Sequence, residues 1–124
     1  MSTDELKQIR LVFQGLQTLL QTYLPKVDPA LIDDLLVREL NKKSEEKSLP
    51  PFYLVEIRTV KGTDQEQMKS MIFEKTGFLP SITEKGTHYV ANMRLSVELL
   101  KEICESQEGI VRITGDFTGG IGGR

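Results

Sequence analysis

The side chains best suited to chemistry are few in this sequence and lie far apart. His88 is the only histidine and Cys104 the only cysteine. The sequence beside His88 offers no serine or cysteine to pair with it as a nucleophile, and the alternation of its strand places the imidazole on the polar side. Cys104 falls on the apolar side of an expected helix, where a thiol packs as a small hydrophobic group. The two residues lack the spacing of zinc ligands. We therefore expect no catalytic residue, no metal site, no cofactor and no enzymatic activity.

The glycine-rich end of the chain is the second feature with chemical potential. Residues 115–124 hold five of the ten glycines. Glycine amides can cradle a phosphate, but this segment does not join a strand to a helix and lacks the lysine and hydroxyl pair of a phosphate loop. We expect a flexible tail that folds onto a protein partner. Its anchors would be the apolar Phe117 and Ile121, with Asp116 and Arg124 fixing the orientation by charge.

Four glutamates form an acidic stripe on the expected helix that follows Ser96. They are spaced by four, three and three residues, and are Glu98, Glu102, Glu105 and Glu108. A solvated helix face explains such a stripe, and docking to a basic partner is the alternative.

Composition and charge exclude several classes of protein. The 124 residues carry 16 basic and 18 acidic side chains, a net charge of -2, which argues against nonspecific nucleic-acid binding. No apolar run approaches the length of a membrane span. The acidic start of the chain, residues 1–5, is unlike a signal peptide. A single cysteine fits a reducing compartment, so we expect a cytoplasmic protein.

The first 48 residues predict a helical hairpin. Apolar residues recur three and four apart over residues 3–24, the period of an amphipathic helix. They are Leu6, Ile9, Phe13, Leu16, Leu20 and Tyr23, with Val12 and Leu19 widening the stripe. Gly15 leaves room for close approach of another helix. A second helix is expected from Asp28, and the short link between the two favours an antiparallel pair.

The remainder of the chain predicts a β-α-β-β-α-β unit over residues 52–114. Alternating strands are interrupted by two helical stretches, and Pro50 and Pro51 mark a boundary near residue 49. Ser2 with Glu5, and Thr63 with Glu66, have the spacing of a capping box. Pro80 places its strand near a sheet edge. The fold class is therefore α+β, with a helical hairpin at 1–48, a ferredoxin-like domain at 49–114 and a flexible tail at 115–124.

Part of the second unit resembles the propeptide-type inhibitors of subtilisin-like proteases. The similar positions lie within residues 88–113, with a fainter likeness over 52–58, and are Tyr89, Ala91, Leu95, Ser96, Glu98, Leu99, Leu100, Gly109, Ile110, Val111 and Ile113. In that family the C-terminal segment enters the protease cleft as an extended strand. The resemblance implies this role for residues 114–124.

Our leading hypothesis is a small adaptor, assembly or regulatory protein that binds another protein without catalysis. Surplus apolar area on the first helix predicts a homodimer. The oligomerisation residues would be the six of the helical stripe, from Leu6 to Tyr23, and the partner-binding residues those of the tail. A protease inhibitor that uses its tail is the alternative, followed by a domain that senses a small ligand.

Overall fold

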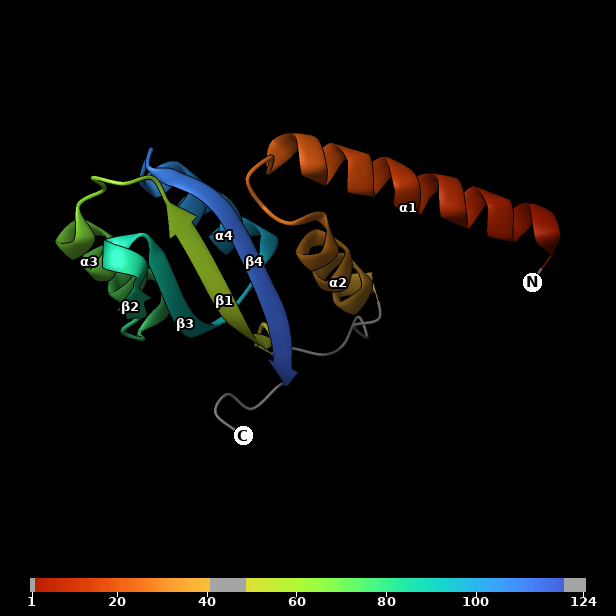
Figure 1. The fold of residues 1–124 in the computed structure, drawn as a ribbon. Coiled ribbons are helices and arrows are strands. Elements are labelled where there is room, and N and C mark those ends of the chain that lie inside the picture. Colours follow the sequence, from red (N-terminus) through yellow and green to blue (C-terminus); the bar gives the residue numbers. More distant parts are fainter. Residues whose placement is uncertain (1, 41–48, 120–124) are drawn as a thin grey trace.

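The structure, a computed structural model, describes residues 2–40 and 49–119 (Figure 1). Its elements are α1 (Thr3–Tyr23), α2 (Pro29–Leu40), β1 (Phe52–Thr59), α3 (Gln65–Thr76), β2 (Ser81–Thr83), the 3-10 turn η1 (Glu84–Gly86), β3 (His88–Arg94), α4 (Val97–Ser106) and β4 (Ile110–Gly119). The strands form one sheet in the order β2-β3-β1-β4, with every neighbouring pair antiparallel. The protein is thus of the α+β class. The strand that follows Pro80, β2, lies at a sheet edge as expected.

Local hydrogen bonds explain where the helices begin. The Ser2 hydroxyl accepts from the Glu5 amide at 3.2 Å, as its spacing predicted. The prediction for Thr63 is wrong, because Asp64 is the N-cap of α3 and accepts from the amide of Gln67 at 3.1 Å. A carboxylate is the stronger acceptor at this position. The Thr63 hydroxyl instead donates to the Val60 carbonyl.

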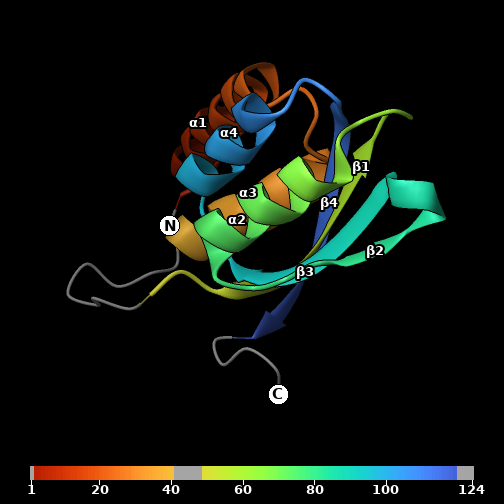
Figure 2. The same cartoon turned by 90° about the vertical axis from the view of Figure 1, so that its left-hand side faces the viewer.

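The sheet buries one face and leaves the other without cover from any residue of 2–40 and 49–119. Side chains alternate along the central strands, so that one set points inward from β1 and β3. These residues are Tyr53, Val55, Ile57, Tyr89, Ala91 and Met93, and they join Met68, Ile72, Leu100 and Ile103 of α3 and α4 in one core. Figure 2 shows the helices on one side of the sheet, with no labelled helix or strand over the opposite face.

The segment from Leu24 to Leu35 belongs to this same core. Leu31 and Ile32 of α2 are almost fully buried among the sheet residues. The turn that leads into α2 is also bonded to β4, because Ile113 donates its amide to the Lys26 carbonyl at 2.9 Å and accepts from the Asp28 amide at 2.8 Å. In packing, α2 and the sheet are one unit, whereas a separate function for residues 1–48 stays a prediction.

The last strand is longer than the sequence predicted. We expected it to end at Thr114 and residues 115–124 to be flexible, but β4 runs on to Gly119, so that prediction is wrong for residues 115–119. Pairing with β1 continues through Gly115 and Phe117, and the Thr118 hydroxyl donates to the Phe52 carbonyl at 3.1 Å. These bonds offset the entropy that glycine loses on ordering. Residues 120–124 lie outside the described part of the chain.

Gly115 serves close packing at this point. A Cβ added there would lie 3.3 Å from the Leu54 carbonyl oxygen and 3.4 Å from the Leu31 side chain. The glycine therefore lets α2 approach β4 closely. Among residues 2–40 and 49–119, no helix is both long and apolar enough to cross a membrane.

Replacing Leu31 tests whether α2 completes the core. We expect Leu31→Ala to lower the free energy of unfolding by about 2–5 kcal/mol, because the side chain is buried and its removal leaves a cavity that the neighbouring residues fill only in part. Val37→Ala, at an exposed position of the same helix, is the matched control and should change it by less than about 0.5 kcal/mol. Urea denaturation measures both, and equal effects would contradict the assignment of α2 to the core.

Candidate functional site

Helix α1 is attached to the rest of the chain along its C-terminal half. The Gln17 side-chain amide donates to Asp33 Oδ1 of α2 at 2.9 Å. Leu20 packs against the core, and the Lys101 ammonium of α4 lies 3.9 Å from the centre of the Tyr23 ring. The N-terminal half extends past the other described elements (Figure 1), and no residue of α1 is fully buried.

The six residues expected to mediate oligomerisation divide into two sets. Phe13, Leu16 and Leu20 are half-buried, whereas Leu6, Ile9 and Tyr23 are exposed. All six lie on one helix. Within the described chain, no element covers the three that are exposed.

A second apolar row lies beside the side of α1 that meets α2. Gln17 marks the side of α1 toward α2, because its side-chain amide bonds to Asp33. A helix turns about 100° per residue, so the row lies roughly a quarter to half a turn around the helix axis from Gln17. We call it the free stripe, and its members are Ile9, Val12, Leu16, Leu19 and Tyr23. Val12 and Leu19 are each 64% exposed and Ile9 52%. Their spacing of three, four, three and four is that of a seam between helices.

The surroundings of Gly15 are open. Apart from its chain neighbours and the backbone of its own helix, no described atom lies within 4 Å of a Cβ placed there. The close approach of another helix that the sequence suggested at Gly15 is therefore not made by the described residues of this chain.

The tail residues proposed for partner binding have different positions. Phe117 faces the core side of β4, with the Arg38 guanidinium 3.3 Å from its ring centre and the Tyr53 ring edge-on at 5.7 Å. It keeps 39% of its surface exposed. Asp116 is exposed on the opposite face of the strand. Ile121 and Arg124 lie outside the described residues.

A polar cluster fixes Arg38 above Phe117. The Tyr53 hydroxyl donates to Asp34 Oδ2 at 2.5 Å, and Arg38 Nε donates to the same oxygen at 3.0 Å. Burial raises the pKa of Tyr53 well above its usual value, and the bond to Asp34 raises it further. Sequence reasoning missed this cluster. The spacing of Asp34 and Arg38 signals an ion pair on a helix, but no local signal connects that pair to a strand 79 residues away at Phe117.

His88 lies in a hydrogen-bonded row on the uncovered face of the sheet. Its Nδ1 lies 3.2 Å from the Thr83 hydroxyl and its Nε2 3.0 Å from Glu56 Oε1, while Thr114 donates to Glu56 Oε2. The row joins all four strands, since these residues come from β2, β3, β1 and β4. It resembles a hydroxyl, base and carboxylate relay in composition. Because each partner is engaged across the sheet, the row holds the strands in register.

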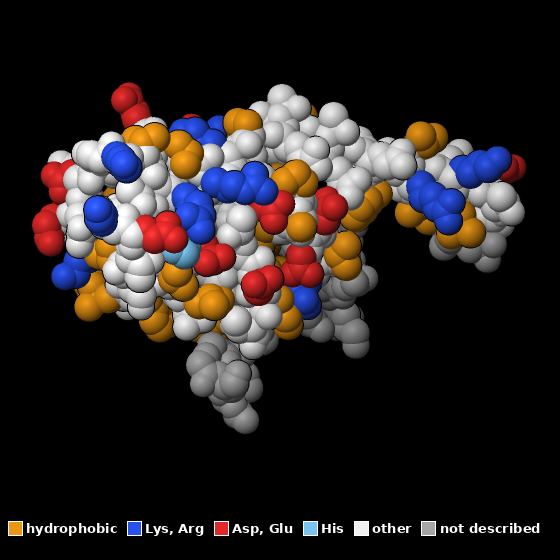
Figure 3. All heavy atoms as spheres, viewed as in Figure 1, with side chains coloured by type: hydrophobic (Ala, Val, Ile, Leu, Met, Phe, Trp, Pro, Cys, Tyr) orange, Lys and Arg blue, Asp and Glu red, His pale blue; other side chains and the backbone are white. Residues whose placement is uncertain are grey.

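Charges of both signs are mixed over this part of the surface. Figure 3 shows Lys and Arg side chains interspersed with Asp and Glu on the side of the molecule seen in Figure 1. Arg58 pairs with Glu84 at 2.9 Å, and Arg112 with Asp28 at 3.4 Å. The uncovered face thus offers no broad field of one sign to steer a charged ligand.

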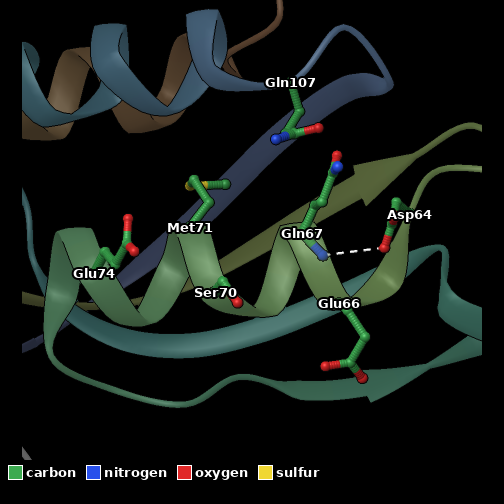
Figure 4. A pocket seen from close by; sticks show the side chains of 7 residues that line it. All are labelled: Asp64, Glu66, Gln67, Ser70, Met71, Glu74 and Gln107. Carbon is green, nitrogen blue, oxygen red and sulfur yellow. Dashed lines mark hydrogen bonds between the residues drawn. The ribbon is translucent and has the colours of Figure 1, made fainter.

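A shallow depression of about 360 Å³ lies between α3 and the end of α4. Figure 4 shows its lining side chains, which are Asp64, Glu66, Gln67, Ser70, Met71, Glu74 and Gln107. Asp64 is already used as the cap of α3. Within residues 2–40 and 49–119, no three His, Cys, Asp or Glu side chains are grouped to hold a metal ion.

The two remaining candidates, Cys104 and the acidic stripe, have surroundings that are ordinary for a core residue and for a helix surface. Cys104 packs partly buried against the core, and burial raises the pKa of its thiol, which keeps it protonated at neutral pH. The glutamates of α4 are exposed, and Glu105 pairs with Lys101 at 3.4 Å. Glu108 lies beyond the end of α4, so the stripe on the helix consists of Glu98, Glu102 and Glu105, and a solvated helix face accounts for it.

Comparison with known proteins gives no relative, because no family model, no curated protein and no solved structure matches this chain. The resemblance to propeptide-type protease inhibitors therefore stays a prediction. Of the segment to which it assigns the cleft-binding role, residues 114–119 lie in β4.

The contacts of Phe117 predict a role in stability. Phe117→Ala should lower the free energy of unfolding by about 1–3 kcal/mol, because the ring fills the space between Tyr53 and Arg38. Val111→Ala, at an exposed position of the same strand, should have little effect. Thermal melting compares the two variants, and an unchanged midpoint for Phe117→Ala would restore the view of a free tail.

The raised pKa of Tyr53 predicts a loss of stability in alkali. The folded chain holds this proton to a higher pH than the unfolded chain, whose tyrosines ionise near pH 10. The contribution is thus fully present below about pH 10 and is lost as the pH rises toward the folded-state pKa. Urea unfolding from neutral pH to about pH 11 should show this loss, and Tyr53→Phe should reduce its slope.

Two other groups contribute to the same slope. Burial also raises the pKa of Tyr89 and of Cys104, so part of the alkaline loss should remain in the Tyr53→Phe variant. A slope identical to that of the unmodified chain would mean that Tyr53 is not held protonated by folding.

Proposed function

We propose that this chain is a non-catalytic protein–protein interaction module that pairs with a second copy of itself through α1. The observation that carries the proposal is the free stripe. A 21-residue helix has no buried residue and carries five apolar side chains at seam spacing, four of them exposed and Leu16 half-buried. Exposed apolar rows of this length are typical of association surfaces.

The charge pattern of α1 favours a second copy as the occupant. The helix carries Asp4, Glu5, Lys7 and Arg10 near its start, and residues 11–23 carry no charge at all. Two such segments meet without repulsion between like charges, and they give a charged partner nothing to pair with. Two-fold pairing is also the commonest form of self-association.

The geometry of the attachment favours the same arrangement. The bonds of α1 to α2 and α4 leave its N-terminal half projecting, at about 1.5 Å per residue, away from the domain. A partner helix can therefore reach the free stripe without displacing α2.

We further propose that residues 52–119 form a ferredoxin-like unit, preceded by α1 and α2 as a helical hairpin. Support comes from the element order β1-α3-β2-β3-α4-β4, the neighbour order β2-β3-β1-β4 and the Gln17–Asp33 contact. Units of this class serve many functions, so the class alone does not select one.

The dimer is tested by charging one side of α1. At tens of micromolar, light scattering of the unmodified chain should give twice the chain mass of 14.0 kDa. Ile9→Lys places a charge in the free stripe and should give the monomer mass, because an unpaired ammonium opposes burial.

Leu11→Lys is the matched control. Leu11 is 66% exposed on the opposite side of the same helix, so this variant should remain a dimer. Circular dichroism should be the same for both variants. A monomer mass for the unmodified chain, or equal dissociation by the two variants, would overturn the proposal.

A further inference from the structure

We propose that the edge of β4 beyond Ile113 docks an extended segment of a partner protein. The segment would place a basic side chain beside Asp116 and apolar side chains on either side of it. This inference concerns the sheet and does not depend on the pairing of α1.

The hydrogen bonds of Ile113 establish which backbone groups point outward from β4. In an antiparallel ladder, the amide and carbonyl of one residue point to the same side, and the side alternates along the strand. Ile113 directs both groups away from β1, to Lys26 and Asp28. The β1–β4 register is regular from Ile113 to Phe117, so Gly115 and Phe117 also direct theirs away from β1.

The edge is hydrogen-bonded at Ile113, whereas beyond it α2 packs against the strand through Leu31 and Arg38 without bonding its backbone. The turn at residues 26–28 makes a parallel bridge to Ile113, which is the first pair of an added strand. Within residues 2–40 and 49–119, no group bonds the outward amides and carbonyls of Gly115 and Phe117. The other edge strand, β2, has only three residues. β4 is therefore the edge long enough to accept a strand.

The edge from Ile113 to Phe117 lacks two of the devices that usually block strand addition, and both register shifts in the β1–β4 pairing lie outside this stretch. The two devices are proline and lysine, and residues 113–119 contain neither. Gly115 adds no side chain that would hinder an incoming backbone. The open edge is thus suited to main-chain recognition.

Side chains next to the edge define what the incoming segment should carry. Asp116 is exposed and makes no ion pair with any described residue, whereas Arg112 on the same face already pairs with Asp28. A basic side chain on the incoming segment would pair with the Asp116 carboxylate on that face. On the other face, Arg38 covers one side of the Phe117 ring, and the part of Phe117 that stays exposed suits apolar side chains. Successive side chains of a strand point to opposite faces, so one incoming strand can place a basic side chain on one face and apolar side chains on the other.

A second copy of β4 fits this edge less well. Antiparallel pairing of Gly115 with Phe117 of a second copy would set the two Asp116 carboxylates opposite each other, and like charges in that position destabilise a sheet. Moving the register toward the start of β4 would need Ile113, whose bonds are already made.

The test is a peptide titration of the isotope-labelled full chain, followed by nuclear magnetic resonance. The probe is the capped heptapeptide Thr-Val-Lys-Val-Lys-Val-Thr, compared with a version carrying glutamate for lysine and a version with N-methylated alternate amides. We expect saturable shifts at the amides of Gly115 and Phe117 with the lysine peptide alone.

Charge variants test the role of Asp116. Asp116→Lys should weaken binding of the lysine peptide by about threefold or more and strengthen that of the glutamate peptide. Glu102→Lys, which makes the same charge change on the exposed face of α4, is the matched control and should leave affinity within about twofold.

Several outcomes would overturn the proposal. They are equal weakening by both variants, undiminished binding of the N-methylated peptide, and an absence of shifts at Gly115 and Phe117 at millimolar peptide. Shifts of these amides with protein concentration alone would assign the edge to a second copy instead.

Discussion

The side chain of Tyr53 joins three segments that are distant in sequence, and much of the fold depends on it. Its ring is buried on the central strand β1, where it packs edge-on against Phe117 of β4. Its hydroxyl donates to Asp34 of α2, which in turn holds Arg38 over the Phe117 ring. A buried hydroxyl without an acceptor costs free energy of desolvation, and the Asp34 carboxylate removes that cost for Tyr53. The position of α2 over β4 therefore follows from a polar requirement as well as from apolar packing.

Much of the fold could be predicted from periodicity, because it is local information. The alternation around Tyr53 and Tyr89 predicted strands that bury one face, and Ser2 predicted the start of α1. The extent of β4 could not be predicted in the same way. The backbone preferences of Gly115 and Gly119 favour a flexible segment. What orders this segment is pairing with β1 and the Arg38 contact to Phe117, which no local pattern encodes. Tertiary contacts outweighed propensity at this point.

Local sequence patterns could likewise predict only part of the candidate site. The apolar row of α1 could be predicted from the spacing of residues such as Ile9 and Leu20, but spacing alone does not divide the row. The Gln17–Asp33 bond makes this division, because it turns one side of α1 toward α2 and leaves Val12 and Leu19 exposed. A broad stripe thus becomes a part that completes the fold and a part available for association. Arg38 and Asp34, which position Phe117, carried only the signal of an ion pair on a helix.

The free stripe and the open edge of β4 leave different kinds of chemical group without a partner. Helix α2 contacts both of the elements that carry them, α1 and β4. The stripe exposes apolar surface, whose association is non-directional and tolerates small changes of register. The edge presents amides and carbonyls, whose association depends on direction and register. Helix α2 contacts α1 through Asp33 and β4 through Leu31 and Arg38. Because packed elements do not deform continuously, a partner that shifts α2 at one surface must change the packing at the other. The two surfaces that we propose for association therefore share α2 as their support.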